Sequence, residues 1–132
     1  MARECLNCGG VMQLATKDVP FEYKGRESGV PKVTGWHCQS CHEVEFAKKG
    51  DGDRFAKAVD QFASEIDAQV AADLARIRKK LKLTQGEAAR ITGGGPNAFS
   101  RYERGKARPL PAVTNLFKIL DRHPELLREL ER

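Results

Sequence analysis

The sequence predicts an α+β protein built from two small domains, and three observations predict it. Residues 1–66 hold two C-x2-C pairs among short β-prone runs, whereas residues 67–132 place apolar side chains at helical spacing. The charge also divides there, because the first half has nine Lys/Arg against ten Asp/Glu and the second has fourteen against eight. We therefore expect a small four-cysteine zinc module with short strands and a helix, followed by an all-α domain of five helices that includes a helix-turn-helix.

Composition narrows the class of protein. The chain is 40% apolar and 31% charged, which is typical of a folded globular protein and argues against disorder throughout. No apolar run approaches the ~20 residues needed to span a bilayer, and the first ten residues lack the apolar core of a signal peptide. We expect a cytoplasmic location, where cysteines serve as metal ligands more often than as disulfides.

The cysteines form two pairs separated by 29 residues: Cys5, Cys8, Cys38 and Cys41. Four thiolates at this spacing converge tetrahedrally on one zinc ion, and Gly9 with Gly10 permits the tight turn after the first pair. A complete thiolate set leaves no open position for water, which predicts one structural Zn²⁺ per chain and not a catalytic metal. His37 and His42 flank the second pair, and we interpret them as neighbours of a completed site. A redox C-x-x-C is the competing interpretation, but neither pair stands where a strand leads directly into a helix.

Three β-prone runs lie between the cysteine pairs, at residues 11–14, 19–23 and 30–37, with turns expected at 17–18 and 24–29. Val19, Phe21 and Tyr23 alternate with charged residues, so one face of the sheet should be apolar. A module this small buries little surface, and bound metal should therefore supply part of its folding free energy.

Helical spacing begins near residue 50. Phe55, Val59 and Phe62 recur at three- and four-residue intervals, with Asp51 or Asp53 as the expected N-cap of a helix over residues 50–64. We expect this helix to close the zinc module. Residues 65–71 contain neither glycine nor proline and predict a short or helical connector to the second domain.

The second domain begins with a helix that ends near Leu83. Thr84 and Glu87 form a T-x-x-E capping box that opens the next helix, and Gly93–Gly95 end it. Pro96 is suited to be the first residue of a third helix. The pattern of helix, glycine-rich turn and helix predicts a helix-turn-helix.

The third helix should bury Ala98, Phe99 and Tyr102 and end at Gly105, which suits the left-handed C′ position. Pro111 should start a fourth helix. A fifth helix, at residues 124–130, carries three leucines that serve either the core or a dimer contact.

Asn97 and Arg101 lie four residues apart, which places both on one face of the third helix. Asparagine matches the edge of adenine, and arginine matches the two acceptors of guanine in the major groove. We therefore predict that these two side chains read DNA bases, and that a two-fold dimer recognises a palindromic operator. Four further residues are predicted to contact phosphate: Gln85, Ser100, Arg104 and Lys106. Other basic residues could join them: Arg76, Lys79, Lys80, Lys82 and Arg108.

Two stretches carry a family resemblance. IRKKLKLTQ followed by SRYERG resembles the helix-turn-helix of the Xre/Cro repressors, and this resemblance implies a structural ion pair between Arg78 and Glu103. GGGPNAFSRYE behind a four-cysteine module resembles the MqsA antitoxin family over nearly the whole chain. Gly86, inside the second helix, departs from related repressors and should weaken that helix.

The MqsA resemblance implies a bipartite protein. Its zinc domain, residues 1–66, would bind an MqsR-like ribonuclease toxin, and residues 67–132 would dimerise and repress the protein's own operon. The same resemblance assigns base reading to Asn97 and Arg101. The alternative is a stand-alone zinc-dependent transcriptional regulator without a toxin partner. The sequence holds no Ser/His/Asp set, paired carboxylates or phosphate loop, and we do not expect an enzyme.

Overall fold

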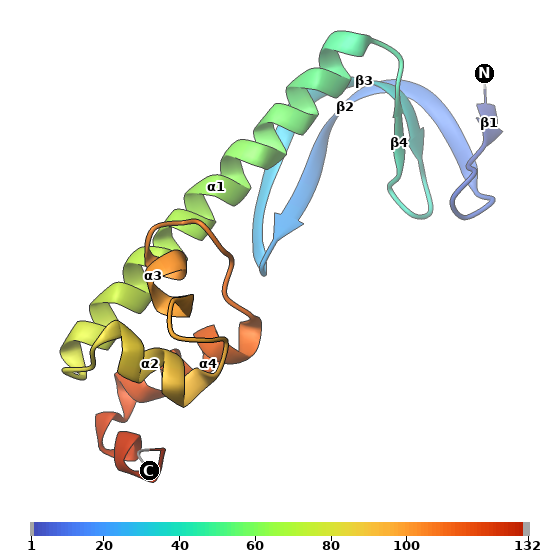
Figure 1. Ribbon diagram of the computed structural model, residues 1–132. Coiled ribbons are helices and arrows are strands. Elements are labelled where there is room, and N and C mark those ends of the chain that lie inside the picture. Colours follow the sequence, from blue (N-terminus) through green and yellow to red (C-terminus); the bar gives the residue numbers. More distant parts are fainter. Residues whose placement is uncertain (1, 131–132) are drawn as a thin grey trace. The chain divides into compact units, whose positions relative to one another are not determined.

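The computed structural model describes residues 2–130 and divides the chain into two compact units, Met1–Ser64 and Glu65–Arg132 (Figure 1). Each unit is described by itself below. The first contains a curled sheet and the second contains helices, so the predicted α+β class is confirmed. The boundary between the units falls inside helix α1 (Lys49–Lys80), and the connecting segment is therefore helical.

The first unit is built on one antiparallel sheet in the order β1-β2-β3-β4. Its strands are β1 (Ala2–Glu4), β2 (Val11–Tyr23), β3 (Arg26–Cys38) and β4 (Val44–Phe46). The long hairpin β2–β3 turns at Lys24 and Gly25, whose φ angles of 51° and 78° match the paired positive φ of a type I′ turn. Three short strands were expected, whereas the structure has two strands of 13 residues in their place.

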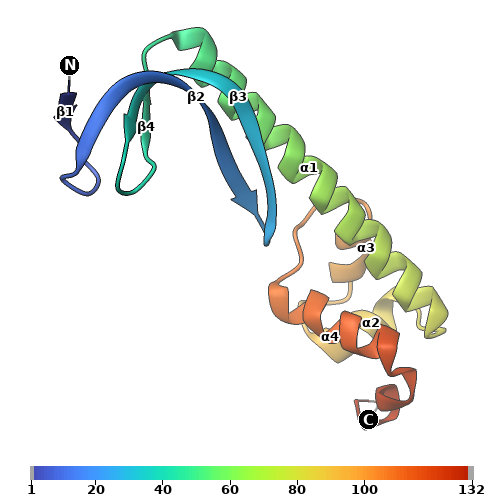
Figure 2. The same ribbon diagram turned by 180° about the vertical axis from the view of Figure 1, so that it is seen from behind.

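The turn expected at residues 17–18 is replaced by a β-bulge. The register shifts between Lys17 and Val19, which leaves Asp18 opposite both Pro31 and Lys32. The Asp18 carboxylate accepts the Lys32 N–H at 3.0 Å, and Lys32 adopts a φ of 52°. Two residues facing one bend a strand pair and increase its twist, and Figure 2 shows the arched hairpin.

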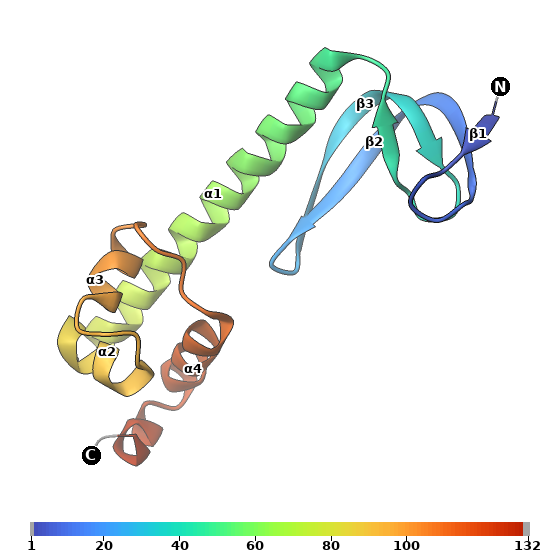
Figure 3. The same cartoon turned by 45° about the vertical axis from the view of Figure 1, so that its right-hand side comes forward.

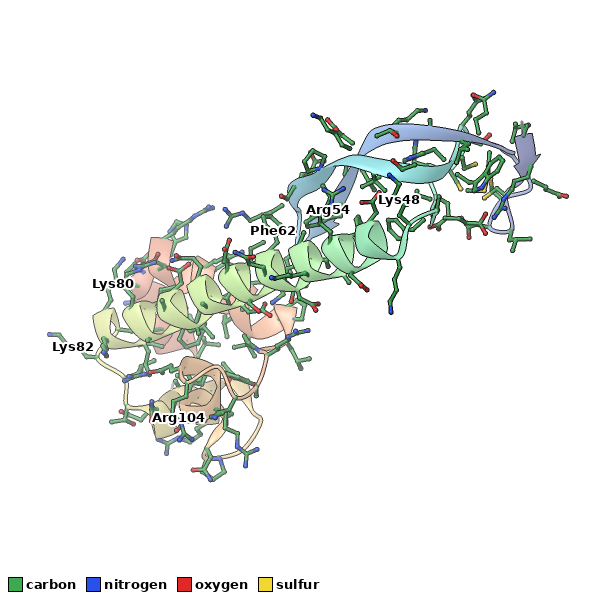
Figure 4. The ribbon with its side chains drawn as sticks, turned by 90° about the horizontal axis from the view of Figure 1, so that it is seen from above. Lys48, Arg54, Phe62, Lys80, Lys82 and Arg104 are labelled. Carbon is green, nitrogen blue, oxygen red and sulfur yellow. The ribbon has the colours of Figure 1, made fainter. Side chains whose placement is uncertain are left out.

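The first turns of α1 cover one face of this hairpin. Phe21 packs edge-on against Phe55 and Phe62, with ring centroids 5.8 and 5.5 Å apart. Arg54 reaches from the helix to the bulge and donates to the Pro31 and Lys32 carbonyls at 2.7 and 3.0 Å (Figure 4). The helix therefore clamps the hairpin at the point where its strands bend.

One expectation about this helix was wrong. Neither Asp51 nor Asp53 is its N-cap, because the helix already begins at Lys49, and the Asp51 carboxylate instead accepts the Thr34 N–H of β3 at 2.9 Å. The helix packs on the apolar cluster of Val19, Val30 and Val33 in the first unit, whereas the cysteine cluster forms a separate group with Met12.

The second unit consists of the C-terminal part of α1 followed by four shorter elements (Figure 3). These are α2 (Gln85–Thr92), α3 (Ala98–Glu103), α4 (Pro111–Arg122) and η1 (Pro124–Glu129). The expected fifth α-helix is a 3-10 helix, in which Leu126 N–H donates to the His123 carbonyl at 3.0 Å. Leu127 and Leu130 pack against the core, while Leu126 remains 41% exposed.

One core holds the second unit together. Its largest fully buried side chains are Phe99, Phe117 and Leu120, and the rings of the two phenylalanines lie 5.0 Å apart. Ten buried residues form this core: Leu74, Ile77, Leu83, Ala88, Ala89, Ala98, Phe99, Val113, Phe117 and Leu120. The helices α1, α2, α3 and α4 all contribute, and α2 and α3 are thereby fixed against α1 and α4.

The helix ends follow the sequence in most places. Thr84 and Glu87 form the complete capping box at the start of α2. At the end of α3 the Lys106 N–H donates to the Arg101 carbonyl at 2.8 Å, and Gly105 takes the left-handed position with φ 73°. This is the Schellman geometry that a C′ glycine favours. Pro96 precedes α3 and does not begin it.

Candidate functional site

The four cysteines converge on one point. Their sulfur atoms all lie within 4.8 Å of one another, with Cys5–Cys41 at 3.7 Å and Cys8–Cys38 at 3.5 Å. Tetrahedral Zn–S bonds of ~2.3 Å imply sulfur–sulfur edges of about 3.8 Å. The cluster therefore has the size and donor set of a tetrathiolate metal site, as predicted from the two C-x2-C pairs.

Two loops of the same form supply these thiolates. In the first, the Cys5 N–H donates to the Gly10 carbonyl at 2.7 Å, and in the second the Cys38 N–H donates to the Glu43 carbonyl at 2.8 Å. Each loop places a left-handed residue four positions after its first cysteine, Gly9 with φ 77° and His42 with φ 66°. The two C-x2-C pairs of the sequence thus form two loops of the same conformation. Each loop contributes two sulfur atoms to the cluster.

Hydrogen bonds to sulfur prepare the cluster for a cation. Backbone N–H groups of Cys41 and Ser40 lower the pKa of Cys38 to about 6, and the Asn7 amide, at 3.5 Å, lowers the pKa of Cys41. The Gly10 N–H also lowers the pKa of Cys8, but the neighbouring thiols and burial outweigh it and raise that pKa to about 12. Metal ions bind thiolates, so metal binding at this cluster would be coupled to release of the remaining thiol protons.

Neither flanking histidine belongs to the ligand set. His37 is buried, and its Nε2 lies 3.0 Å from the Val33 carbonyl. His42 is exposed and occupies the turn of the second loop. Both histidines are therefore neighbours of the cysteine site.

The predicted base readers lie on the outer side of α3. Asn97 immediately precedes the helix, and its carbonyl accepts the Arg101 N–H at 3.1 Å, so the helical spacing between them holds. Both residues are exposed, and neither side chain makes a hydrogen bond or ion pair within residues 2–130. Phe99, between them in sequence, is fully buried and fixes the helix to the core.

An ion pair joins the end of α1 to the end of α3. Arg78 donates from Nε and Nη2 to the two Glu103 oxygens at 2.7 and 3.0 Å, and from Nη1 to the Leu83 carbonyl at 2.8 Å. Both side chains are largely buried, at 12% and 11% exposed. The Arg78 guanidinium and the Gln85 amide lower the pKa of Glu103 against the opposing effect of burial, which is its largest single influence. The pair therefore holds the helix that carries Asn97 and Arg101.

Comparison with known proteins identifies the family. A sequence model described as the antitoxin component of a bacterial toxin-antitoxin system, MqsA, matches residues 3–131. The antitoxin MqsA of Escherichia coli K12 is 42% identical over 123 residues, which cover 92% of this chain and 93% of that protein. This chain belongs to the MqsA antitoxin family. The structure of the N-terminal domain of E. coli MqsA is also similar, with 28% identity over 50% of this chain and 98% of that one and a TM-score of 0.41.

Membership of the MqsA family makes this chain a regulatory antitoxin and not an enzyme. Within residues 2–130, no helix is both long and apolar enough to cross a bilayer.

The four candidate phosphate contacts of this MqsA-family antitoxin differ in exposure and in the hydrogen bonds that they already make. Gln85 already donates to Glu103 Oε1 at 3.2 Å, which ties α2 to α3. Ser100 is half-buried, while Arg104 and Lys106 are exposed. Arg104 rests on its own helix, with Nε 3.2 Å from the Ser100 carbonyl. Arg104 and Lys106 are thus the two of these four with a cationic group open to solvent.

Several other basic side chains of this MqsA-family chain are engaged in ion pairs. Arg76 and Lys80 both contact the Asp121 carboxylate, at 3.1 and 2.9 Å, and Arg108 contacts Asp67 at 3.1 Å. No local sequence pattern predicts the Asp121 pairs, because the partners lie more than 40 residues apart in the chain. Lys79 and Lys82, by contrast, are exposed; Lys82 stands at the end of α1 in Figure 4.

Proposed function

We propose that this chain is the antitoxin of a type II toxin-antitoxin system with two activities. Its first unit, folded around one Zn²⁺, binds an MqsR-like ribonuclease toxin. Its second unit binds double-stranded DNA as a dimer and represses its own operon. The observation that carries DNA recognition is the pair of exposed side chains, Asn97 and Arg101, one turn apart on a helix anchored by buried Phe99.

Base reading follows from this arrangement. The Asn97 amide can both donate and accept, which matches adenine, while the Arg101 guanidinium donates twice, which matches guanine. Each contact is worth about 1–3 kcal/mol of discrimination. Because Arg78 and Glu103 fix the end of α3, little conformational freedom remains to be lost on binding.

The test compares affinities for operator and random DNA. We expect Asn97→Ala and Arg101→Ala to weaken operator binding about 10-fold or more and to change random-sequence binding little. Lys118→Ala, an exposed cation of α4, serves as the matched control. Equal losses on both DNAs would show that the two residues contact only the backbone.

Residues that contact phosphate should affect DNA affinity differently from residues that read bases. Arg104 and Lys106 follow the base readers and are exposed, which supports contacts to the DNA backbone. Gln85 and Ser100 complete the proposed set through hydrogen-bonding side chains. Arg104→Ala and Lys106→Ala should each weaken operator and random DNA alike and lower the salt-dependence slope by about 0.9.

Zinc is the proposed metal because four thiolates at tetrahedral spacing leave no open position. Elemental analysis of the purified protein should give one zinc per chain. Cys38→Ser should lower that value, while His42→Ala should leave it unchanged because His42 is not a ligand.

Dimerisation through the second unit is supported by exposed apolar side chains. Ile119 of α4 and Leu126 of η1 are apolar side chains that remain 51% and 41% exposed. A two-fold dimer places two recognition helices about one DNA turn or a multiple of it apart, which implies a palindromic operator. Ile119→Asp should convert the dimer to a monomer in sedimentation experiments and abolish cooperative operator binding.

The toxin partner is tested by copurification. The full chain should bind the ribonuclease encoded beside its gene, and residues 1–66 should carry that binding. A chain that represses its promoter yet binds no such ribonuclease would instead be a stand-alone regulator.

A further inference from the structure

A pocket of about 350 Å³ opens beside the cysteine cluster, within the first unit. Its apolar walls come from Leu6, Met12 and Val44. Leu6 stands at the tip of the first cysteine loop and is 92% exposed, whereas Met12 is buried and forms a floor. An exposed leucine beside an apolar pocket is a surface on which another molecule can bury apolar area.

The polar groups of this pocket are acceptors. Glu43 and Glu45 both line it, and Glu43 uses one oxygen only for its neighbour's backbone N–H at 3.3 Å. Asn7 directs its amide nitrogen at the Cys41 sulfur, 3.5 Å away, which leaves its oxygen as an acceptor. The pocket therefore presents carboxylate and amide oxygens around an apolar floor.

The charge balance of the pocket is negative. Arg3 is the cation beside it, but its Nε donates to Glu45 at 3.0 Å and its guanidinium lies 4.7 Å from the Trp36 ring centroid. Glu43 makes no ion pair within residues 2–130. Cys5 also lines the pocket, and the four thiolates would carry a net charge of −2 with the proposed divalent cation bound. An incoming cation would therefore meet uncompensated negative charge.

We propose that this pocket receives a lysine or arginine side chain of the toxin, an inference that rests on the proposed antitoxin function. Such a side chain has an apolar stem, which fits Leu6 and Met12, and a cationic end, which fits Glu43 and the Asn7 oxygen. Burial of the stem displaces water from the carboxylate and strengthens the charge interaction. The pocket thus acts as an anchor point, in which one buried basic side chain fixes the position of the toxin.

The test measures toxin affinity for the full zinc-loaded chain by calorimetry. We expect Glu43→Lys to weaken binding of the purified neighbouring-gene ribonuclease roughly 10-fold or more, and Glu43→Gln and Leu6→Ala to weaken it less. Asp60→Lys is the control, because it makes the same charge change at an exposed site on α1. Zinc content and circular dichroism show that each variant is folded.

A charge swap makes the test specific. Lysines and arginines of the toxin are changed one at a time to glutamate, and one such variant should bind Glu43→Lys better than it binds the unmodified chain. Equal affinities for Glu43→Lys and Asp60→Lys, or the absence of any rescuing toxin variant, would overturn the pocket assignment and leave the antitoxin function standing. Failure of the unmodified chain to bind the ribonuclease would overturn both.

Discussion

The two units of this antitoxin are stabilised by different means. The first has two separate clusters of three buried residues, one of which contains Cys5 and Cys38. The second has a single core of ten buried residues contributed by its helices. Because hydrophobic stabilisation scales with buried apolar area, we expect the second unit to fold on its own core and the first to depend on the metal proposed for its cysteine cluster. Units of similar length therefore have different vulnerabilities.

The largest effect should come from metal removal. A chelator should unfold residues 1–64 and leave residues 65–130 helical, because structural zinc supplies apparent free energies of about 10–16 kcal/mol in small metal-held domains. Hydrogen exchange resolved by segment measures both halves in one sample. Simultaneous loss of protection in both units would contradict the difference between them.

The corresponding experiment on the second unit creates a cavity in its core. Phe99 is fully buried between Tyr102 and Phe117, and Phe99→Ala should destabilise this unit by about 3–5 kcal/mol. Thermal unfolding followed by far-ultraviolet circular dichroism measures the change. Zinc content should stay at one per chain, since residue 99 lies outside the metal unit.

A smaller loss should follow from breaking the Arg78–Glu103 pair. Glu103→Ala leaves a largely buried guanidinium without its carboxylate, and we expect a loss of about 2–3 kcal/mol in urea unfolding. Glu103→Gln, which keeps a hydrogen-bond acceptor, should lose less. Operator affinity should fall in the same order, because this pair positions α3.

Replacing a lysine that has a positive φ angle with glycine should raise stability in both units, whereas the preceding changes should lower it. Lys82 follows the end of α1 and has φ 61°, in the same hydrogen-bonding pattern that Gly105 completes after α3, and Lys32 takes φ 52° at the bulge. Lys82→Gly should stabilise the second unit by up to about 1 kcal/mol, and Lys32→Gly should do the same for the first. Chemical denaturation with zinc present resolves the two gains. A loss in either variant would mean that the lysine side chain contributes more than its backbone strain costs.

The two units should also unfold at different pH values. Hydrogen bonds from Arg76 and Lys80 hold the pKa of Asp121 at about 2, below its unfolded value, so this stabilisation is present above pH 4 and disappears as the pH falls toward 2. Thiolates instead exchange their metal for protons under milder acid. The first unit should therefore unfold at a higher pH than the second. Asp121→Asn should reduce the pH dependence of the free energy of unfolding of the second unit below pH 4, and leave that of the first unit unchanged.

Local sequence signals predicted the start of α2, the end of α3 and the convergence of the four cysteines, although they misplaced the starts of α1 and α3. The Thr84 capping box, the terminal Gly105 and the paired cysteines each act through neighbouring residues, and each has the predicted geometry. The bulge at Lys32 could not be predicted in this way. It depends on Asp18 from the opposite strand and Arg54 from the helix, and such long-range contacts leave no periodic trace in the sequence.

The same limit explains the position of α1. Its apolar spacing at Phe55 and Phe62 predicted a helix but not which surface it covers. The ring of Phe21 decides this, because it stands on the hairpin and not near the cysteines. The pocket beside the metal site was also missed, since Leu6 and Glu43 come from opposite loops and carry no shared motif.

The two cysteine loops sit at the open end of the hairpin, and the Lys24–Gly25 turn closes its other end. Met12 pairs with Cys38 in the correct alignment. A slip of one residue would rotate that cysteine to the opposite side of the strand, where its sulfur could not join the other three. A bound ion would therefore favour the correct strand pairing, because only the aligned hairpin brings all four sulfur atoms together at tetrahedral spacing.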